Sequence, residues 1–210
     1  TMASNVYSAQ IKQCIEVGGR DQIRHLKTIH GHIIKTLPFP ETLLLNNIIH
    51  GYAKIRNSTY ARRVFDKIPQ PNLFSWNNLL MAYSKSGHLS DMERTFEKLP
   101  NRDSVTWNLL ISGYSGNGLV GAAVKAFNTM MMKDGSDNLT RVTLMTMLNL
   151  SSTNGHGILG KQIHGQIVKR GFEYYLLVGS PLLDMYAKVG LISEAKKVFY
   201  SFEDRNTVMY

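Results

Sequence analysis

The sequence contains a single cysteine, Cys14, among its 210 residues. One cysteine cannot form an internal disulfide bond, and it cannot build a cysteine-rich zinc site. It also cannot supply the H-x-E and P-C-x-x-C signature of a zinc cytidine deaminase. The single cysteine therefore argues against a cysteine-bound zinc ion and against a deaminase. We expect no metal site, no cofactor and no enzymatic activity in this chain.

Acidic residues and long apolar runs are scarce as well. Asp and Glu number 15 against 24 Lys and Arg, which gives a formal net charge of +9 at pH 7. An excess of this sign suits a polyanionic partner. The stretch 142–160 contains no charged residue, but polar residues and glycine interrupt it too often for it to span a bilayer, so no membrane partner is expected.

Aromatic residues recur along the chain with a spacing of 31 residues. Phenylalanine occupies positions 65, 96 and 127, tyrosine positions 52, 83 and 114, and tryptophan positions 76 and 107. A longer period relates segments 134 residues apart, because Lys-Thr-Ile-His-Gly at 27–31 returns as Lys-Gln-Ile-His-Gly at 161–165. Periods of about 20 to 50 residues are typical of repeat proteins. The sequence therefore predicts an array of similar units.

Each period contains two apolar stripes with helical spacing. In one unit, Trp76, Leu79, Leu80 and Tyr83 stand at i, i+3, i+4 and i+7, the pattern of an amphipathic helix. After a Ser-Gly break, a second stripe follows at positions 89, 92, 96 and 99. Neither helix can bury its stripe alone, so neighbouring pairs must stack. The sequence predicts an all-α fold, a right-handed α-solenoid of stacked helix-turn-helix repeats, with the aromatic residues in its core.

Units of this length would also fit a tetratricopeptide array, whose period is about 34 residues. The detailed pattern instead resembles the pentatricopeptide repeat (PPR) family, on the segments Phe-Ser-Trp-Asn-Asn-Leu-Leu-Met-Ala-Tyr-Ser-Lys-Ser-Gly at 74–87 and Ala-Arg-Arg-Val-Phe-Asp-Lys-Ile-Pro at 61–69. The segment 159–172, Leu-Gly-Lys-Gln-Ile-His-Gly-Gln-Ile-Val-Lys-Arg-Gly-Phe, resembles the long motif of the plant PLS subclass. The resemblance covers essentially the whole chain.

Phasing on this resemblance implies six units and the beginning of a seventh. They are a long motif at 7–41, short motifs at 42–72 and 73–103, a P-type motif at 104–140, a long motif at 141–175, a short motif at 176–206, and the first residues of another unit at 207–210. The first unit departs from the pattern at Gln10 and Gln13. Because the chain stops inside a repeat, we expect a fragment that exposes apolar surface around Val198, Phe199 and Phe202 and self-associates through its ends.

A basic groove of helical repeats suits single-stranded RNA, because each repeat can meet one base. The resemblance implies that the fifth and last residues of a repeat together face the Watson–Crick edge of a base. These pairs are Asn46 with Asn72, Asn77 with Asp103, Asn108 with Thr140, and Ser180 with Asn206. Asn138 is the alternative to Thr140, and a helix N-cap is the alternative role of any single Asn. If the long motifs read no base, the RNA element that the resemblance implies is N-Y-U-Y-N-A from 5′ to 3′, where Y is a pyrimidine and N is any base.

The resemblance also assigns residues around the base and the phosphate. Second positions would sandwich the base, and they are Leu43, Phe74, Val105 and Leu177. Thirteenth positions that could approach phosphate are Lys54, Lys85 and Lys188. In the long motifs the corresponding base-reading pairs are Ile11 with Glu41 and Met145 with Tyr175, which are poorly suited to reading a base edge.

The resemblance implies sequence-specific RNA binding, as a specificity factor for C-to-U editing or processing of organellar RNA. Editing-complex proteins are the further partners it implies, and the mitochondrion, with the chloroplast as alternative, is the location. A protein-interaction scaffold is the alternative function from another class. A peptide-binding groove would need Lys and Arg where this sequence has Asn46, Asn77, Asn108 and Ser180.

Two patterns point to other chemistry and are not favoured. The segment 155–161 matches G-x-G-x-x-G and G-x-x-x-x-G-K, but Gln162 stands where a P-loop needs Ser or Thr, and a dinucleotide site needs a preceding strand. His25, His30 and His32 invite a metal site, but no second ligand cluster accompanies them. We interpret His30 as a helix-packing residue.

Overall fold

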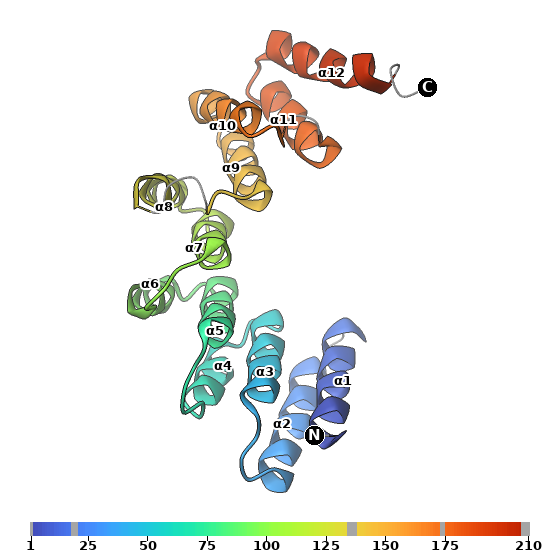
Figure 1. The fold of residues 1–210 in the computed structure, drawn as a ribbon, viewed down its shortest axis with the longest axis vertical. Helices are drawn as coiled ribbons and strands as arrows, with labels where there is room; N and C mark the ends of the chain where they lie inside the picture. The colour runs from blue at the N-terminus through green and yellow to red at the C-terminus, as the bar shows by residue number, and fades with distance from the viewer. Residues whose placement is uncertain (1, 18–20, 134–137, 173–174, 207–210) are drawn as a thin grey trace. The chain divides into compact units, whose positions relative to one another are not determined.

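The computed structural model describes residues 2–17, 21–133, 138–172 and 175–206 of the chain (Figure 1). Within these residues the chain forms twelve helices and no strand, which confirms the predicted all-α fold. The helices are α1 (Met2–Val17), α2 (Gln22–Thr36), α3 (Thr42–Lys54), α4 (Ser58–Phe65), α5 (Leu73–Ser86), α6 (Leu89–Lys98), α7 (Ser104–Gly116), α8 (Val120–Lys133), α9 (Arg141–Thr153), α10 (Gly157–Lys169), α11 (Leu176–Lys188) and α12 (Ile192–Asn206). No helix in this described part is long and apolar enough to cross a membrane.

The helices come in pairs, one pair to each expected unit. Helices α3, α5, α7, α9 and α11 begin at residues 42, 73, 104, 141 and 176, the first residues of the expected units. Helix α1 begins at residue 2, five residues before the first expected unit. The residues at 207–210, where a seventh unit was expected to begin, lie outside the described part of the chain.

The chain divides into two compact units, Thr1–Asn117 and Gly118–Tyr210. In the first unit the leading helices of successive repeats, α1, α3, α5 and α7, pack side by side, and the second helices α2, α4 and α6 pack against them. In the second unit α9 packs against α11, α10 packs against both, and α12 packs against α11. The leading helices of each unit therefore form one layer, and a residue at a fixed phase in one repeat lies near its equivalent in the next.

Aromatic residues pack against one another between successive repeats of the first unit. Phe65 of α4 meets Trp76 of α5 edge-to-face, with ring centroids 4.7 Å apart, and Phe96 of α6 meets Trp107 of α7 in the same way at 4.8 Å. Such pairs stabilise beyond the apolar area they bury. The stripe residues Leu79 and Leu80 are fully buried. These contacts confirm that the recurring aromatics are core residues.

The surface expected at the C-terminal end is only partly exposed. Val198 is buried, whereas the neighbouring Phe199 is half exposed. The side chains of Phe202 and of the residues after it lie outside the described part of the structure.

From the second repeat onward, the two helices of a repeat are joined by a tight turn with one residue in the left-handed region of backbone space. Glycine holds this position at Gly87, Gly118, Gly155 and Gly190, where φ lies between +68° and +79°. The equivalent residue after α3 is Arg56, with φ +57°. A side chain costs about 1–2 kcal/mol in this region, whereas a cation at an exposed helix C-terminus gains only about 0.3–1 kcal/mol. Arg56 therefore stands in a strained conformation that the other repeats assign to glycine.

Candidate nucleic-acid interface

The packing of α3 against α5 brings the first expected reader pair together. Asn46 lies in α3 and is almost completely buried, whereas Asn72 is exposed immediately before α5. The Asn46 amide Nδ2 donates to Asn72 Oδ1 over 3.5 Å. Oδ1 of Asn46 is buried and has no hydrogen-bond partner within the described residues. A buried acceptor without a donor costs about 1–3 kcal/mol, so this reader is short of one donor.

The same arrangement recurs one repeat later. Asn77 of α5 donates from Nδ2 to Asp103 Oδ1, again over 3.5 Å. Its own Oδ1 lies 2.9 Å from the Thr106 hydroxyl, whose single proton is shared with Asp103 Oδ1 at 2.7 Å. Residues 26 positions apart in the sequence are thus joined twice by the same contact, because α5 packs on α7 as α3 packs on α5.

The last residue of each of three expected units is also the N-cap of the next leading helix. Asn72, Asp103 and Thr140 each accept a hydrogen bond from a backbone amide three residues later, at 2.9, 2.8 and 3.3 Å. In all three, the side chain of that later residue accepts in return from the cap's backbone amide, forming a capping box. Thr140 rather than Asn138 therefore holds the position equivalent to Asn72 and Asp103.

In Asn72 and Asp103, capping occupies one side-chain oxygen and leaves the other polar atom of the side chain for a ligand. Oδ1 of Asn72 and of Asp103 receives the cap bond and the bond from the reader asparagine. Asn72 Nδ2 and Asp103 Oδ2 make no hydrogen bond within the described residues. The N-cap role and a base-reading role are therefore compatible, because they use different atoms of one side chain.

Asp103 is held in its ionised form. Partial burial raises the pKa of its carboxyl group, but hydrogen bonds from the Thr106 amide and hydroxyl and from Asn77 outweigh burial and hold that pKa below its ordinary value. At neutral pH the side chain is therefore a pure acceptor. It matches a ligand group that donates a hydrogen bond.

The other two expected pairs are Asn108 with Thr140 and Ser180 with Asn206. Asn108 in α7 is half-buried and belongs to the first unit, whereas the half-buried Thr140 belongs to the second. Ser180 is exposed on α11. Asn206 is the last residue of α12, and its side chain lies outside the described part of the structure.

Exposed apolar side chains occupy the second position of the leading helices. The four expected residues are exposed to half or more of their surface, Leu43 by 63%, Phe74 by 54%, Val105 by 50% and Leu177 by 70%. Val142 of α9 has the same position and is 58% exposed. Val142 was not among the expected stacking residues because its long motif was not expected to read a base. Its position in the repeat could have identified it as one.

The three expected phosphate-binding lysines are all exposed at the C-terminal ends of leading helices. Lys188 Nζ contacts Asp184 Oδ2 of its own helix at 2.7 Å. Lys54 and Lys85 form no ion pair within the described residues. Partial burial lowers the pKa of Lys85, and the nearby charges of Lys54 and Arg56 lower it further. Of these three lysines, the two in the first unit are therefore without an ion pair in the described part of the chain, and the one in the second unit is paired.

A shallow hollow lies between α1 and α3. Its lining combines apolar side chains such as Ile11 and Ile15 with polar and charged ones. The residues that line it are Ser8, Ala9, Ile11, Lys12, Ile15, Glu16, Asn47, His50 and Lys54. Ile11, the expected reader of the first long motif, is almost fully buried there.

The two patterns that pointed to other chemistry do not form sites. Gly155 lies in the turn after α9, and Gly157 begins α10, so a helix stands where a dinucleotide site needs a strand. His30 Nδ1 lies 3.1 Å from the Tyr52 hydroxyl, and His164 makes the same contact with Tyr186 at 2.8 Å. The histidine is therefore a packing residue that recurs with the 134-residue period. Among the described residues, no group of three or more potential metal ligands gathers.

The sequence is similar to known plant proteins over its full length. It is 79% identical over 209 residues to a putative pentatricopeptide repeat-containing protein of Arabidopsis thaliana, a match that covers 100% of this chain and 28% of the relative. A second putative pentatricopeptide repeat-containing protein of Arabidopsis thaliana, named as mitochondrial, is 32% identical over 208 residues, with 99% of this chain and 27% of the relative covered. Among further relatives, one name carries the word mitochondrial and another chloroplastic. The chain thus spans between a quarter and a third of the length of these two relatives.

Solved structures share the fold. The crystal structure of the pentatricopeptide repeat protein PPR10 in complex with an 18-nt psaJ RNA element superposes with a TM-score of 0.71 at 21% identity, covering 96% of this chain and 31% of that one. This likeness confirms an all-α helical-repeat solenoid. The family model described as PPR repeat matches residues 74–104, 105–134 and 180–207. The chain therefore contains PPR repeats and is similar from end to end to pentatricopeptide repeat proteins.

Proposed function

We propose that this chain is an RNA-binding segment of a PPR protein, in which each short or P-type repeat recognises one base of a single strand. The observation that carries the proposal is the recurrent contact between the fifth residue of one repeat and the cap of the next. Asn46 meets Asn72, and Asn77 meets Asp103, at the same distance of 3.5 Å. Short polar pairs repeated at one phase suit the reading of successive bases.

The chemistry of the two pairs supports different bases. Ionised Asp103 accepts but cannot donate, so the Asn77 pair favours a base with a donor on its edge, such as uracil at N3. The Asn46 pair contains amide groups only, and an amide offers both a donor and an acceptor. That pair therefore suits either pyrimidine. The buried Oδ1 of Asn46 would gain the donor it lacks if its side chain turned toward a bound base.

Side chains near the pairs can contact the bases and the phosphates of a single-stranded RNA. The exposed side chains at second positions offer apolar surface on which bases can stack, a contact worth about 1–3 kcal/mol per base when the side chain is aromatic. Lys54 and Lys85 offer uncompensated positive charge for phosphates. Amides, and not Lys or Arg, stand at the reader positions 46, 77 and 108, which favours RNA over a peptide carboxylate as the ligand.

We further propose that the repeats are of the PLS subclass and that the long motifs do not read bases. Ile11, at the reader position of the first long motif, is apolar and offers no hydrogen-bonding group to a base edge. In this proposal the parent protein is a specificity factor for C-to-U editing or processing of organellar RNA, in the mitochondrion rather than the chloroplast. It acts with editing-complex proteins, and the chain binds RNA without itself catalysing a reaction.

The decisive experiment measures fluorescence anisotropy with single-stranded RNA containing N-Y-U-Y-N-A, beside a control strand with purines at the three specified pyrimidine positions. We expect tighter binding to the first strand. Asn77→Ala should weaken it by about two- to tenfold, because a hydrogen bond from a neutral amide is worth about 0.5–1.5 kcal/mol. Asn128→Ala removes an exposed asparagine from the second helix α8 and should leave binding unchanged.

The position of the effect distinguishes the outcomes. Loss of discrimination only at the U, caused by Asn77→Ala, supports base reading by the pair. Equal binding of both strands with a steep salt dependence would show that the interface binds any polyanion through its positive charge, and it would contradict base reading. No binding of either strand would favour the protein-interaction scaffold.

A further inference from the structure

The turn after α3 does not need the side chain of Arg56. In this turn the Arg56 amide donates to Ala53 O at 3.2 Å, and the next amide donates to Tyr52 O at 2.9 Å. The glycine turn after α5 has the same two bonds, from Gly87 to Ser84 O at 3.3 Å and from the next amide to Tyr83 O at 3.0 Å. Glycine therefore closes this turn equally well and without strain. The turn itself gives no reason for an arginine.

The side chain of Arg56 adds a third positive charge to a surface that already has two. Its charge and that of Lys54 both act on Lys85 at the end of α5. All three side chains are exposed, and none forms an ion pair in the part of the chain that the structure describes. The backbone strain at Arg56 and its repulsion of Lys85 thus have no compensating ion pair in the described part of the chain.

We propose that Arg56 is a phosphate-binding residue, which with Lys54 and Lys85 forms an anchoring site for the RNA backbone between the second and third repeats. This inference rests on the RNA-binding function proposed above. A phosphodiester placed between the three side chains would relieve their repulsion. The guanidinium fork also binds two phosphate oxygens at once, a geometry that an ammonium group does not match.

The site is particular to this turn. In the equivalent turn after α11, Gly190 replaces the arginine, and Lys188 is already bound to Asp184. In the turn after α9, Gly155 has the same left-handed backbone, and the thirteenth residue is Thr153 instead of lysine. We therefore expect a phosphate to be held more firmly at Arg56 than at either of these turns.

The test substitutes Arg56 in two ways that relieve the strain and one that keeps the charge. Arg56→Gly and Arg56→Asn both suit a left-handed residue and should raise the Tm by about 2–4 °C. Both should weaken binding of N-Y-U-Y-N-A RNA two- to fivefold at 50 mM salt, and the salt slope should fall by about 0.7, the value for one phosphate contact on a single strand. Arg56→Lys should retain most of the affinity.

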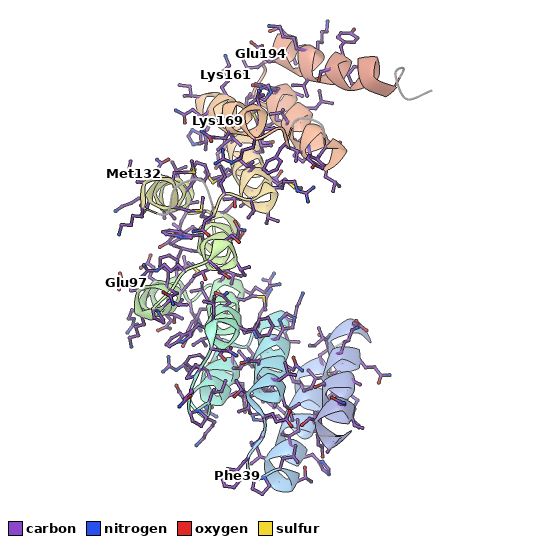
Figure 2. All side chains as sticks on the ribbon, in the orientation of Figure 1. Phe39, Glu97, Met132, Lys161, Lys169 and Glu194 are labelled. Carbon is purple, nitrogen blue, oxygen red and sulfur yellow. The ribbon has the colours of Figure 1, made fainter. Side chains whose placement is uncertain are left out.

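A matched control removes one charge where no RNA contact is proposed. Lys169 is exposed at the end of the second helix α10 (Figure 2), and Lys169→Gln should leave both affinity and salt slope unchanged. A stabilised Arg56→Gly protein with unchanged affinity and slope would overturn the inference, while loss of discrimination in Asn77→Ala would still support base reading. If the parent chain binds no RNA, the proposed function fails, and the inference about Arg56 fails with it.

Discussion

In the first unit, Lys54 and Lys85 at the ends of α3 and α5 have no acidic partner within the described residues, whereas in the second unit Lys188 at the end of α11 binds Asp184 at 2.7 Å. The reader positions differ in the same direction. The first unit has asparagines joined to their caps, and the second has Ser180, a shorter side chain with one polar atom. The same repeat architecture therefore carries unpaired lysines at the ends of α3 and α5 in the first unit and a paired lysine at the end of α11 in the second, within the described residues.

The stacking positions provide the largest expected difference between the units. Phe74→Ala should weaken RNA binding by about tenfold or more, because an aromatic stacking partner is worth about 1–3 kcal/mol. Val142→Ala in the second unit should weaken it by less than about threefold, because a valine offers no aromatic face. Both side chains are at least half exposed, so neither substitution should alter the Tm. The measurement is anisotropy titration at fixed salt.

The control for stacking is Val168→Ala, which removes an exposed valine from the second helix α10. Equal losses for Phe74→Ala and Val168→Ala would contradict stacking at second positions. A loss for Val142→Ala as large as that for Phe74→Ala would show that the long motif at 141–175 contacts a base as firmly as the short motifs do.

The caps provide a difference that depends on pH. Asp103→Ala and Thr140→Ala should each lower the free energy of unfolding by about 0.5–2 kcal/mol at pH 7. The folded-state pKa of Asp103 lies below the ordinary value, which is about 3.9. Its stabilisation is therefore complete above the ordinary value and is lost as the pH falls through the folded value. The effect of Asp103→Ala should shrink between pH 7 and pH 3, while that of uncharged Thr140 should not.

Urea denaturation followed by circular dichroism at the two pH values measures both caps. Taking the difference between each variant and the parent chain removes the titration of the other carboxyl groups. A loss from Asp103→Ala that is the same at pH 3 as at pH 7 would show that its hydrogen bonds do not favour the ionised form.

The ion pair of the second unit provides the smallest expected effect. Asp184→Asn frees the Lys188 charge and should raise RNA affinity by less than about threefold, and only at low salt, because exposed ion pairs are weak and screened. Asp66→Asn breaks a similar 2.7 Å pair with Arg62 on the second helix α4 and serves as the control. If both substitutions raised the affinity equally, net charge and not the position of Lys188 would explain the gain.

The periodic features were accessible from the sequence because they depend on local structure. The 31-residue spacing of the aromatics, the helix breaks at glycine and the apolar stripes all follow from helical geometry and burial within one repeat. They predicted the helix pairs, whereas the unit boundaries at which the leading helices begin from α3 onward followed from phasing on the resemblance to PPR repeats. The residues of the reader pairs followed from the resemblance to PPR repeats, and their assignment to bases stays a prediction.

The tertiary structure decided which side chains meet across repeats. Hydrogen bonding between Asn77 and Asp103, and the effect of Arg56 on Lys85, depend on how α5 packs against its neighbours, which no local pattern specifies. The same packing showed that Asn72 and Asp103 act as caps while keeping a second polar atom for a ligand. Sequence periodicity therefore determined the helix pairs, and the resemblance to PPR repeats gave their phase. The packing of the leading helices decided which charges and hydrogen-bonding groups interact, because those interactions depend on distances between residues far apart in the chain.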